Sequence, residues 1–266
     1  MRTICIALLT LFLVSSCIPA RPKAGAQVPA RQVRTENPAL TVTKISSAEI
    51  IIDYEGFTVS YNPQRRIPNW VFYELTAEET NGPYSRKGKN FQQDSSSQVP
   101  QSDSYDFRGS GWSRGHMAPA ADFKWSDSAM WETFYYTNIC PPQDRELNNR
   151  YWNTLENKVR SWAKQFGKVY VVTGPIIGKN VNGVIGSHGV TIPDAFFKAI
   201  LAPLADGWTS IAFMMENTPD QRYFKDCATT VNVVEKMTGF DFFSSLDDSV
   251  EESIEDLLDY KTWRVY

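Results

Sequence analysis

The residues from Leu147 to Phe166 place apolar side chains at helical spacing, and this pattern constrains the fold more than any other part of the chain. The apolar positions are Trp152, Leu155, Val159, Trp162, Ala163 and Phe166. They recur three or four residues apart, so they form one apolar face on a long helix that ends at Gly167. Because such a face must be buried against another layer, the pattern predicts a domain built around one long amphipathic helix.

Short runs rich in β-branched and aromatic residues predict strands before and after this helix. The predicted strands are Ile50–Tyr54, Phe57–Tyr61, Trp70–Leu75, Lys168–Thr173, Ala195–Leu201 and Ser210–Met215. The first two form a hairpin, and Gly174 and Pro175 are expected to end the fourth. Two further helices are expected at Thr229–Met237 and Ser249–Leu258. Strands and helices do not alternate regularly, so we expect an α+β domain with a largely antiparallel central sheet and helices packed on it.

The N-terminus has the layout of a secretory signal, with Arg2 followed by an apolar run from Ile4 to Val14. The segment from Val14 to Cys17 is similar to the lipobox of bacterial lipoproteins. It predicts a signal peptide at residues 1–16, lipidation of Cys17, and an exported protein tethered to a bacterial membrane on the periplasmic or cell-surface side. Ordinary secretion is the alternative. Residues 17–45 are rich in Pro, Ala and polar residues and are expected to be a linker, which leaves 46–266 as the folded domain.

Two cysteines remain once Cys5 and Cys17 are assigned to the signal and to the lipid. Cys140 and Cys227 form an even pair, which predicts a disulfide bridge in an oxidising compartment, with two buried free thiols as the alternative. Neither has a second cysteine or a histidine at ligand spacing, so a zinc site is not expected.

The charge pattern argues against a broad basic surface that binds nucleic acid. The net charge is −3 and the sequence pI is about 5.5. However, Lys and Arg gather between Arg65 and Lys124, whereas the stretch from Asp241 to Asp259 is acidic. We therefore expect a locally basic cleft on an acidic protein.

A long polar stretch from Asn81 to Ser113 leads directly to His116, one of two histidines in the chain. Loops of that length in a compact domain are usually functional. Imidazole is the side chain best suited to take a proton near neutral pH, and Arg114 offers a planar fork of donors to a phosphate. The pair suits phosphodiester hydrolysis. His188 lies among Gly and Ser residues and is interpreted as a loop residue without a catalytic role.

Phosphodiester hydrolysis commonly uses a divalent cation, and the start of the long helix offers oxygen ligands. Asn148 stands at that start, where its other ordinary role is to cap the helix. Glu156 follows after about two helical turns, on roughly the same side, where it can hold metal-bound water. Magnesium fits this set because it keeps several waters and needs few protein oxygens; Mn²⁺ or another divalent cation is the alternative.

Three segments resemble the DNA/RNA non-specific endonucleases of the ββα-metal type, a family that includes bacterial sugar-nonspecific nucleases and mitochondrial endonuclease G. They are the run RGHMAPAAD around His116, the NxxPPQ segment from Asn138, and LNxxxWxxLE on the long helix. Together these motifs are highly specific for the family, and the similarity extends from about Glu49 to the C-terminus.

The resemblance implies a strand-strand-helix core in which His116 is the general base and Asn148 is the direct protein ligand of Mg²⁺. Glu156 would orient the metal-bound waters, Asn138 would position the base or the metal cluster, and Arg114 would hold the phosphate. Lys89, or alternatively Arg86, would be a second basic contact. The resemblance also implies cleavage of DNA and RNA without sequence preference, which leaves 5′-phosphate and 3′-hydroxyl ends.

The chain departs from the family pattern in two places. Ser113 stands where many members have Asp, so we expect another group, such as a backbone carbonyl, to hold His116. The doubled Pro141-Pro142 lengthens the gap between Asn138 and Asn148, which makes Asn149 an alternative ligand. Ser113 and the acidic composition also motivate an alternative function, a non-catalytic surface lipoprotein that uses the same fold for binding.

Overall fold

The structure is a computed structural model that describes residues 49–138, 141–178 and 182–266. The signal, the lipidation site and the linker expected in residues 1–45 lie outside the described residues, as does Cys140. No helix within the described ranges is long and apolar enough to cross a membrane.

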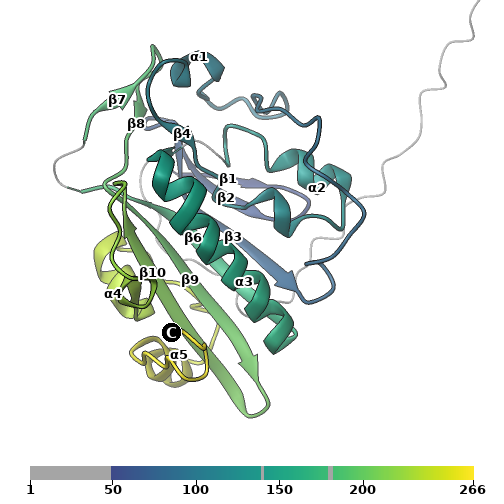
Figure 1. Cartoon of the computed structure of the whole chain (residues 1–266), viewed down its shortest axis with the longest axis vertical. Coiled ribbons are helices and arrows are strands. Elements are labelled where there is room, and N and C mark those ends of the chain that lie inside the picture. Colours follow the sequence, from purple (N-terminus) through teal and green to yellow (C-terminus); the bar gives the residue numbers. More distant parts are fainter. Residues whose placement is uncertain (1–48, 139–140, 179–181) are drawn as a thin grey trace, which may run out of the picture. The chain divides into compact units, whose positions relative to one another are not determined.

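A seven-stranded sheet forms the centre of the domain, and all neighbouring strands in it are antiparallel (Figure 1). In spatial order its strands are β1 (Ile50–Asp53), β2 (Thr58–Asn62), β3 (Ile67–Thr76), β6 (Lys168–Ile176), β9 (Ala195–Leu204), β10 (Gly207–Glu216) and β11 (Ala228–Thr229). The predicted α+β class and the antiparallel sheet are confirmed.

Strand β6 continues through Gly174 and Pro175 to Ile176, so the prediction that these residues end it is wrong. The reason lies in the pairing of β6. Its ladder with β3 stops at Thr173, and at Pro175 the strand pairs only with β9, opposite Phe196. A proline fits where a strand has a partner on one side only, because one missing N–H then costs no ladder bond on the other side.

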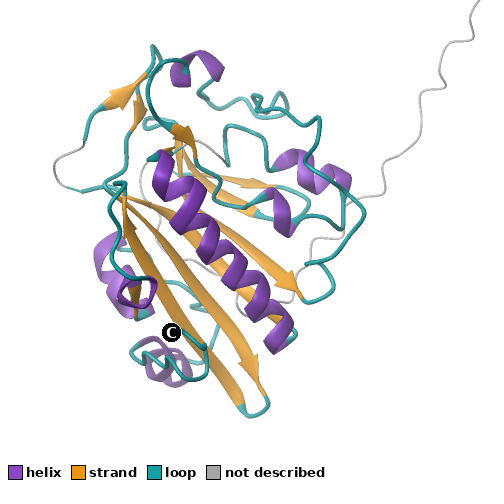
Figure 2. Ribbon diagram, viewed as in Figure 1, coloured by secondary structure: helices purple, strands orange, loops and turns teal. Residues whose placement is uncertain are grey.

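Alternating residues of the strands pack against helices on opposite faces of the sheet (Figure 2). On one face, Val71 and Tyr73 of β3 belong to the same core cluster as the apolar residues of α3 (Asn153–Phe166). On the other face, Phe72 belongs to a second cluster with residues of α4 (Val231–Thr238) and α5 (Asp248–Glu255). Successive side chains of a strand point to opposite faces of the sheet, so the two-residue repeat that predicted the strands also produces two separate hydrophobic cores.

The remaining elements are short and lie between the long strands. They are α1 (Ser104–Phe107), β4 (Ser113–Arg114), η1 (Ala120–Asp122), α2 (Asp127–Glu132), β5 (Pro142–Gln143), the π-helical η2 (Leu147–Trp152), β7 (Val184–Ile185), β8 (Val190–Thr191) and η3 (Phe224–Cys227). The polar stretch from Asn81 to Ser113 is almost entirely loop, apart from α1.

Candidate active site

The strand-strand-helix core expected from the resemblance is present. Strand β4 pairs antiparallel with β5, Ser113 lying opposite Gln143, and the helix η2–α3 follows β5. Asp144 begins that helix, because its side chain accepts hydrogen bonds from the backbone N–H groups of Glu146 (2.8 Å) and Leu147 (3.0 Å). The helix therefore has its capping residue before Asn148 is reached.

The first turn of the helix is wound as a π-helix, and this turn carries Asn148 and Asn149. Single π-helical turns occur frequently at functional sites. Among the described residues, none forms a hydrogen bond with the Asn148 side chain, so its carboxamide is available to a ligand. Asn148 and Asn149 both line the same cavity.

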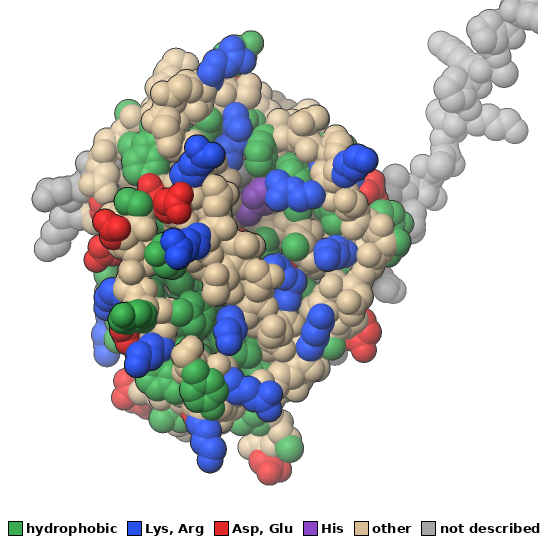
Figure 3. Space-filling view, in the orientation of Figure 1, with side chains coloured by type: hydrophobic (Ala, Val, Ile, Leu, Met, Phe, Trp, Pro, Cys, Tyr) green, Lys and Arg blue, Asp and Glu red, His purple; other side chains and the backbone are tan. Residues whose placement is uncertain are grey.

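That cavity has a volume of about 860 Å³ and brings together side chains from four separate parts of the chain. Of the residues predicted from the sequence, it is lined by Arg114, His116, Asn148, Asn149, Glu156 and Arg86. Figure 3 shows Lys and Arg side chains spread over this face of the domain, with a histidine in a hollow among them. Lys89 does not line the cavity. It forms an ion pair with Asp127 at 2.6 Å and lies over the ring of Trp131.

The His116 ring packs between two aromatic rings, 5.5 Å from Phe91 and 5.4 Å from Phe134 between centroids. Its Nε2 atom is buried and has no hydrogen-bond partner in the part of the chain that the structure describes. Burial, together with the charge of Arg86, lowers the pKa of His116 to about 3, so the ring is neutral and able to accept a proton. Aromatic packing, rather than the backbone carbonyl that we expected, holds the ring where Ser113 replaces Asp.

Asn138 is fully buried and does not line the cavity. Its side chain accepts a hydrogen bond from Ala118 N (3.0 Å) and donates to Ala118 O (3.1 Å) and Thr133 O (2.9 Å). It therefore fixes the main chain just after His116, which is a positioning contact.

Arg114 lies against two aromatic rings at the wall of the cavity. Its guanidinium carbon is 5.1 Å from the centre of the Phe91 ring and 5.3 Å from that of Phe107. One terminal nitrogen donates to Ser104 O at 3.5 Å, while Nε is buried without a partner. The planar fork is thus held in place with donor capacity left for an anion.

Arg160 is a cavity residue that the sequence reasoning missed. It donates to Asp122 at 2.6 Å, and the Tyr73 hydroxyl donates to the other oxygen of Asp122 at 3.0 Å. Asp122 ends the motif that contains His116, so this contact ties the motif to α3. Arg160 follows Glu156 by one helical turn, so the periodicity of the helix was a signal that could have found it.

Glu156 lines the same cavity, and burial raises its pKa to about 7. The positive charge of Lys198 opposes this shift most strongly, ahead of Arg160. The protonation state of this carboxylate near neutral pH therefore depends on the neighbouring positive charges.

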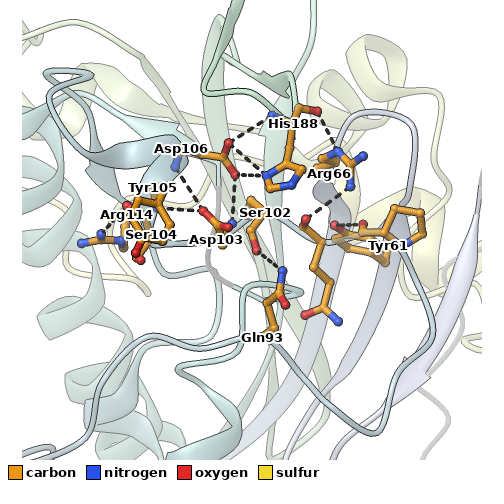
Figure 4. Close-up of polar contacts among 12 residues, drawn as sticks. Tyr61, Arg66, Gln93, Ser102, Asp103, Ser104, Tyr105, Asp106, Arg114 and His188 are labelled. Carbon is orange, nitrogen blue, oxygen red and sulfur yellow. Dashed lines mark hydrogen bonds and ion pairs between the residues drawn. The ribbon is translucent and has the colours of Figure 1, made fainter.

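A second group of titratable side chains lies beside α1 and outside the cavity (Figure 4). Nδ1 of His188 lies 2.9 Å from the buried carboxylate of Asp106, and Asp103 caps α1. Potential ligand atoms of these three residues lie within 4.8 Å of one another. Their hydrogen bonds link the β7–β8 hairpin to α1, so His188 has a structural contact, in line with its interpretation as a loop residue.

Cys227 is buried, and its sulfur lies 3.9 Å from Arg222 O. Because Cys140 lies outside the described residues, the Cys140–Cys227 bridge stays a prediction.

Comparisons with known proteins agree with this geometry. The profile of the DNA/RNA non-specific endonuclease family matches residues 37–249. Mitochondrial nuclease EXOG of Mus musculus is 36% identical over 218 residues, which cover 74% of this chain and 57% of that protein. Mitochondrial endonuclease G of Homo sapiens is 36% identical, covering 62% and 59%. Nuclease C1 of Cunninghamella echinulata var. echinulata is 34% identical, covering 76% and 86%.

The fold comparison points the same way. A chain in the crystal structure of the EndoG/EndoGI complex, whose title describes the mechanism of EndoG inhibition, matches with a TM-score of 0.69 and 31% identity. The match covers 75% of this chain and 88% of that one. This chain spans about three fifths of the length of the mitochondrial relatives.

The relatives contradict the expected localisation. They include mitochondrial nucleases of eukaryotes, among them one of Schizosaccharomyces pombe, so the prediction of an exported bacterial lipoprotein anchored through Cys17 is wrong. That prediction depended on four residues at the end of an apolar run, and a basic residue followed by an apolar run does not identify one targeting route. In sequence, in fold and in the residues around its cavity, the chain belongs to the DNA/RNA non-specific endonuclease family.

Proposed function

We propose that this chain is a Mg²⁺-dependent endonuclease that hydrolyses phosphodiester bonds of DNA and RNA without sequence preference. Cleavage leaves 5′-phosphate and 3′-hydroxyl ends. The observation that carries the proposal is that one cavity is lined by a neutral histidine, a half-buried glutamate, several arginines and an asparagine whose side chain has no partner among the described residues. Family membership supports the same reaction.

The donor set of the cavity suits a hard divalent cation. The Asn148 side chain has no hydrogen-bond partner in the described part of the chain, and the carboxylate of Glu156 lines the same space. Magnesium prefers such oxygen ligands and keeps several waters, which Glu156 would orient. Asn149 is the alternative ligand, and Mn²⁺ the alternative ion. When bound, the cation would neutralise charge on the phosphate and stabilise the leaving 3′-oxygen.

His116 acts as the general base. Its ring is neutral because burial keeps its pKa far below 7, and among the described residues no hydrogen bond occupies Nε2. The packing of Phe91 and Phe134 fixes the plane of the ring, so the accepting nitrogen keeps its direction. A water held against the ring would lose its proton to it as oxygen attacks phosphorus.

Recognition rests on the phosphate rather than on the base. Arg114, Arg86 and Arg160 line the cavity and offer donors to phosphate oxygens. The aromatic rings of Phe91 and Phe107 are covered by the guanidinium of Arg114, so they are not free platforms for stacking of bases. An enzyme of this kind accepts DNA and RNA alike.

The test is to incubate the purified full chain with plasmid DNA and with total RNA in the presence of Mg²⁺. Both should be degraded to fragments with 5′-phosphate ends, and a chelator should stop the reaction. His116→Ala should remove cleavage while the melting temperature stays close to that of the wild type. A matched control is His188→Gln, which keeps a donor for Asp106 and should retain most activity.

Absence of cleavage across divalent metals and pH would refute the proposal. Retained binding of nucleic acid in that case would favour a non-catalytic protein that uses the same fold for binding. Full activity of His116→Ala would show that His116 is not the general base, although the protein would still be a nuclease.

A further inference from the structure

Lys198 on β9 is a lysine without any exposed surface, and its neighbours along the strand, Phe197 and Ala199, are apolar. Lysine is almost never fully buried unless its ammonium is paired, because removal of a charge from water is costly. Its Nζ donates to Met117 O at 3.3 Å and to Thr173 Oγ1 at 3.2 Å, and it lies 4.7 Å from the centre of the Trp152 ring. These partners are two neutral acceptors and an aromatic face, and no carboxylate forms an ion pair with the ammonium among the described residues.

Those three contacts join the parts of the chain that carry the site. Met117 directly follows His116, and its carbonyl is held from beneath by Lys198. Trp152 lies in the π-helical turn that carries Asn148, and it also donates from its indole N–H to His116 O at 3.4 Å. Lys198 itself does not line the cavity, so it does not touch a substrate there.

Charged side chains at the cavity and behind it act on one another, namely Asp122, Glu156, Arg160 and Lys198. Asp122 and Arg160 form one pair in direct contact at 2.6 Å. Lys198 is the cation that lowers the pKa of Glu156 most strongly, ahead of Arg160. Because Asp122 already neutralises Arg160, loss of the ammonium of Lys198 would leave Glu156 without its main counter-charge.

We propose that Lys198 is a positioning residue, which fixes from inside the domain both the main chain that follows His116 and the helical turns that carry Asn148 and Glu156. Its ammonium also favours the charged form of the Glu156 carboxylate. This inference rests on the proposed function, because it concerns the geometry of that reaction.

The main test is Lys198→Met, which keeps the length and apolar stem of the side chain and removes the ammonium. We expect turnover on DNA to fall about 100-fold, because small displacements of catalytic groups cost that much, while KM changes little. The acid limb of the pH–rate profile should move to higher pH, because Glu156 loses the positive charge that lowers its pKa most. A matched control is Lys168→Met, a half-exposed lysine of β6 paired with Glu74, which should leave both parameters unchanged.

A double-mutant cycle separates this role from a general loss of structure. If Lys198 acts through Glu156, then Lys198→Met combined with Glu156→Gln should lose at least tenfold less activity than the product of the two single losses. The inference would be overturned if the activity losses of the two single variants simply multiply in the double variant. It would also be overturned if Lys198→Met keeps full activity while the wild type is active. In either case the proposed function would still stand. An inactive wild type would overturn both.

If Lys198→Met does not fold, Thr173→Val tests the positioning role of Lys198 instead. It removes one of the two hydrogen-bond acceptors of the ammonium and keeps the charge. A fall in kcat without a change in KM supports the inference, and an unchanged kcat contradicts it.

Discussion

Asn138 offers the sharpest test of how the site is held together, because its side chain makes three hydrogen bonds and touches no substrate. Asn138→Ala would leave three buried backbone groups without partners, namely Ala118 N, Ala118 O and Thr133 O. An unsatisfied buried group costs about 1–3 kcal/mol, and a water entering the space left by the amide recovers part of that cost.

We therefore expect Asn138→Ala to destabilise the domain by about 3–5 kcal/mol. For a domain of this size, that loss lowers the melting temperature by about 6–20 °C. The segment just after His116 would also lose its anchor, so kcat measured at about 20 °C should fall even though the protein remains folded. Differential scanning calorimetry and a plasmid-nicking assay measure the two effects.

The matched control is Asn232→Ala, a half-buried asparagine with one long bond of 3.4 Å to Asp256. It should change the free energy of unfolding by less than about 0.5 kcal/mol. If Asn138→Ala melts and cleaves like the wild type, the three bonds neither stabilise the domain nor position the base, and the reasoning is refuted.

Further predictions concern the metal, the charge of the cleft and the pH dependence of stability. Asn148→Ala should abolish Mg²⁺ binding in calorimetry with the fold intact, whereas Asn149→Ala should bind the ion normally; the opposite result would exchange their roles. Binding of DNA to an inactive variant should weaken steadily as salt rises, because phosphate contacts release counterions, and a salt-independent affinity would contradict this mode. Burial raises the pKa of Glu255 to about 9, so the folded state binds a proton that the unfolded state releases, and stability should fall as pH rises from about 5 to 9. Glu255→Gln keeps a donor for Glu235 without a charge, so it should raise the melting temperature at about pH 8 more than at about pH 5, while exposed Glu252→Gln should do neither.

Periodicity predicted most of the fold because burial on each face of the sheet repeats every second residue. The helix from Leu147 and the long strands appear where the apolar pattern placed them. The exceptions have local causes. The pattern could not show that Pro175 lies where β6 has only one partner, because pairing is a property of the assembled sheet.

The cavity residues were predictable for a different reason, since they stand in three short motifs with specific spacing. His116, Arg114, Asn148 and Glu156 line one cavity, as the motifs implied. The spacing did not show that Asp144 caps the helix or that the first turn is π-helical, because both depend on backbone geometry. Lys198 lies in a run that reads simply as a buried strand.

The side chains that line the cavity and those beneath it differ in how many of their hydrogen-bonding groups have protein partners. At the cavity, His116 Nε2 and Arg114 Nε are buried without protein partners, and the Asn148 amide has none within the described residues. Beneath it, Asn138 makes three hydrogen bonds to backbone groups, and the Lys198 ammonium makes two, to a backbone carbonyl and a hydroxyl group.

Unfilled polar groups cost stability, so they persist only where the surrounding structure holds them in place. The satisfied layer provides that support, because it links the chain after His116 to the sheet and to α3, and it does so without using any donor that faces the cavity. It follows that variants of the inner layer should lower turnover with little effect on binding. Variants of Arg114 should weaken binding first, because this side chain lines the cavity and carries a positive charge.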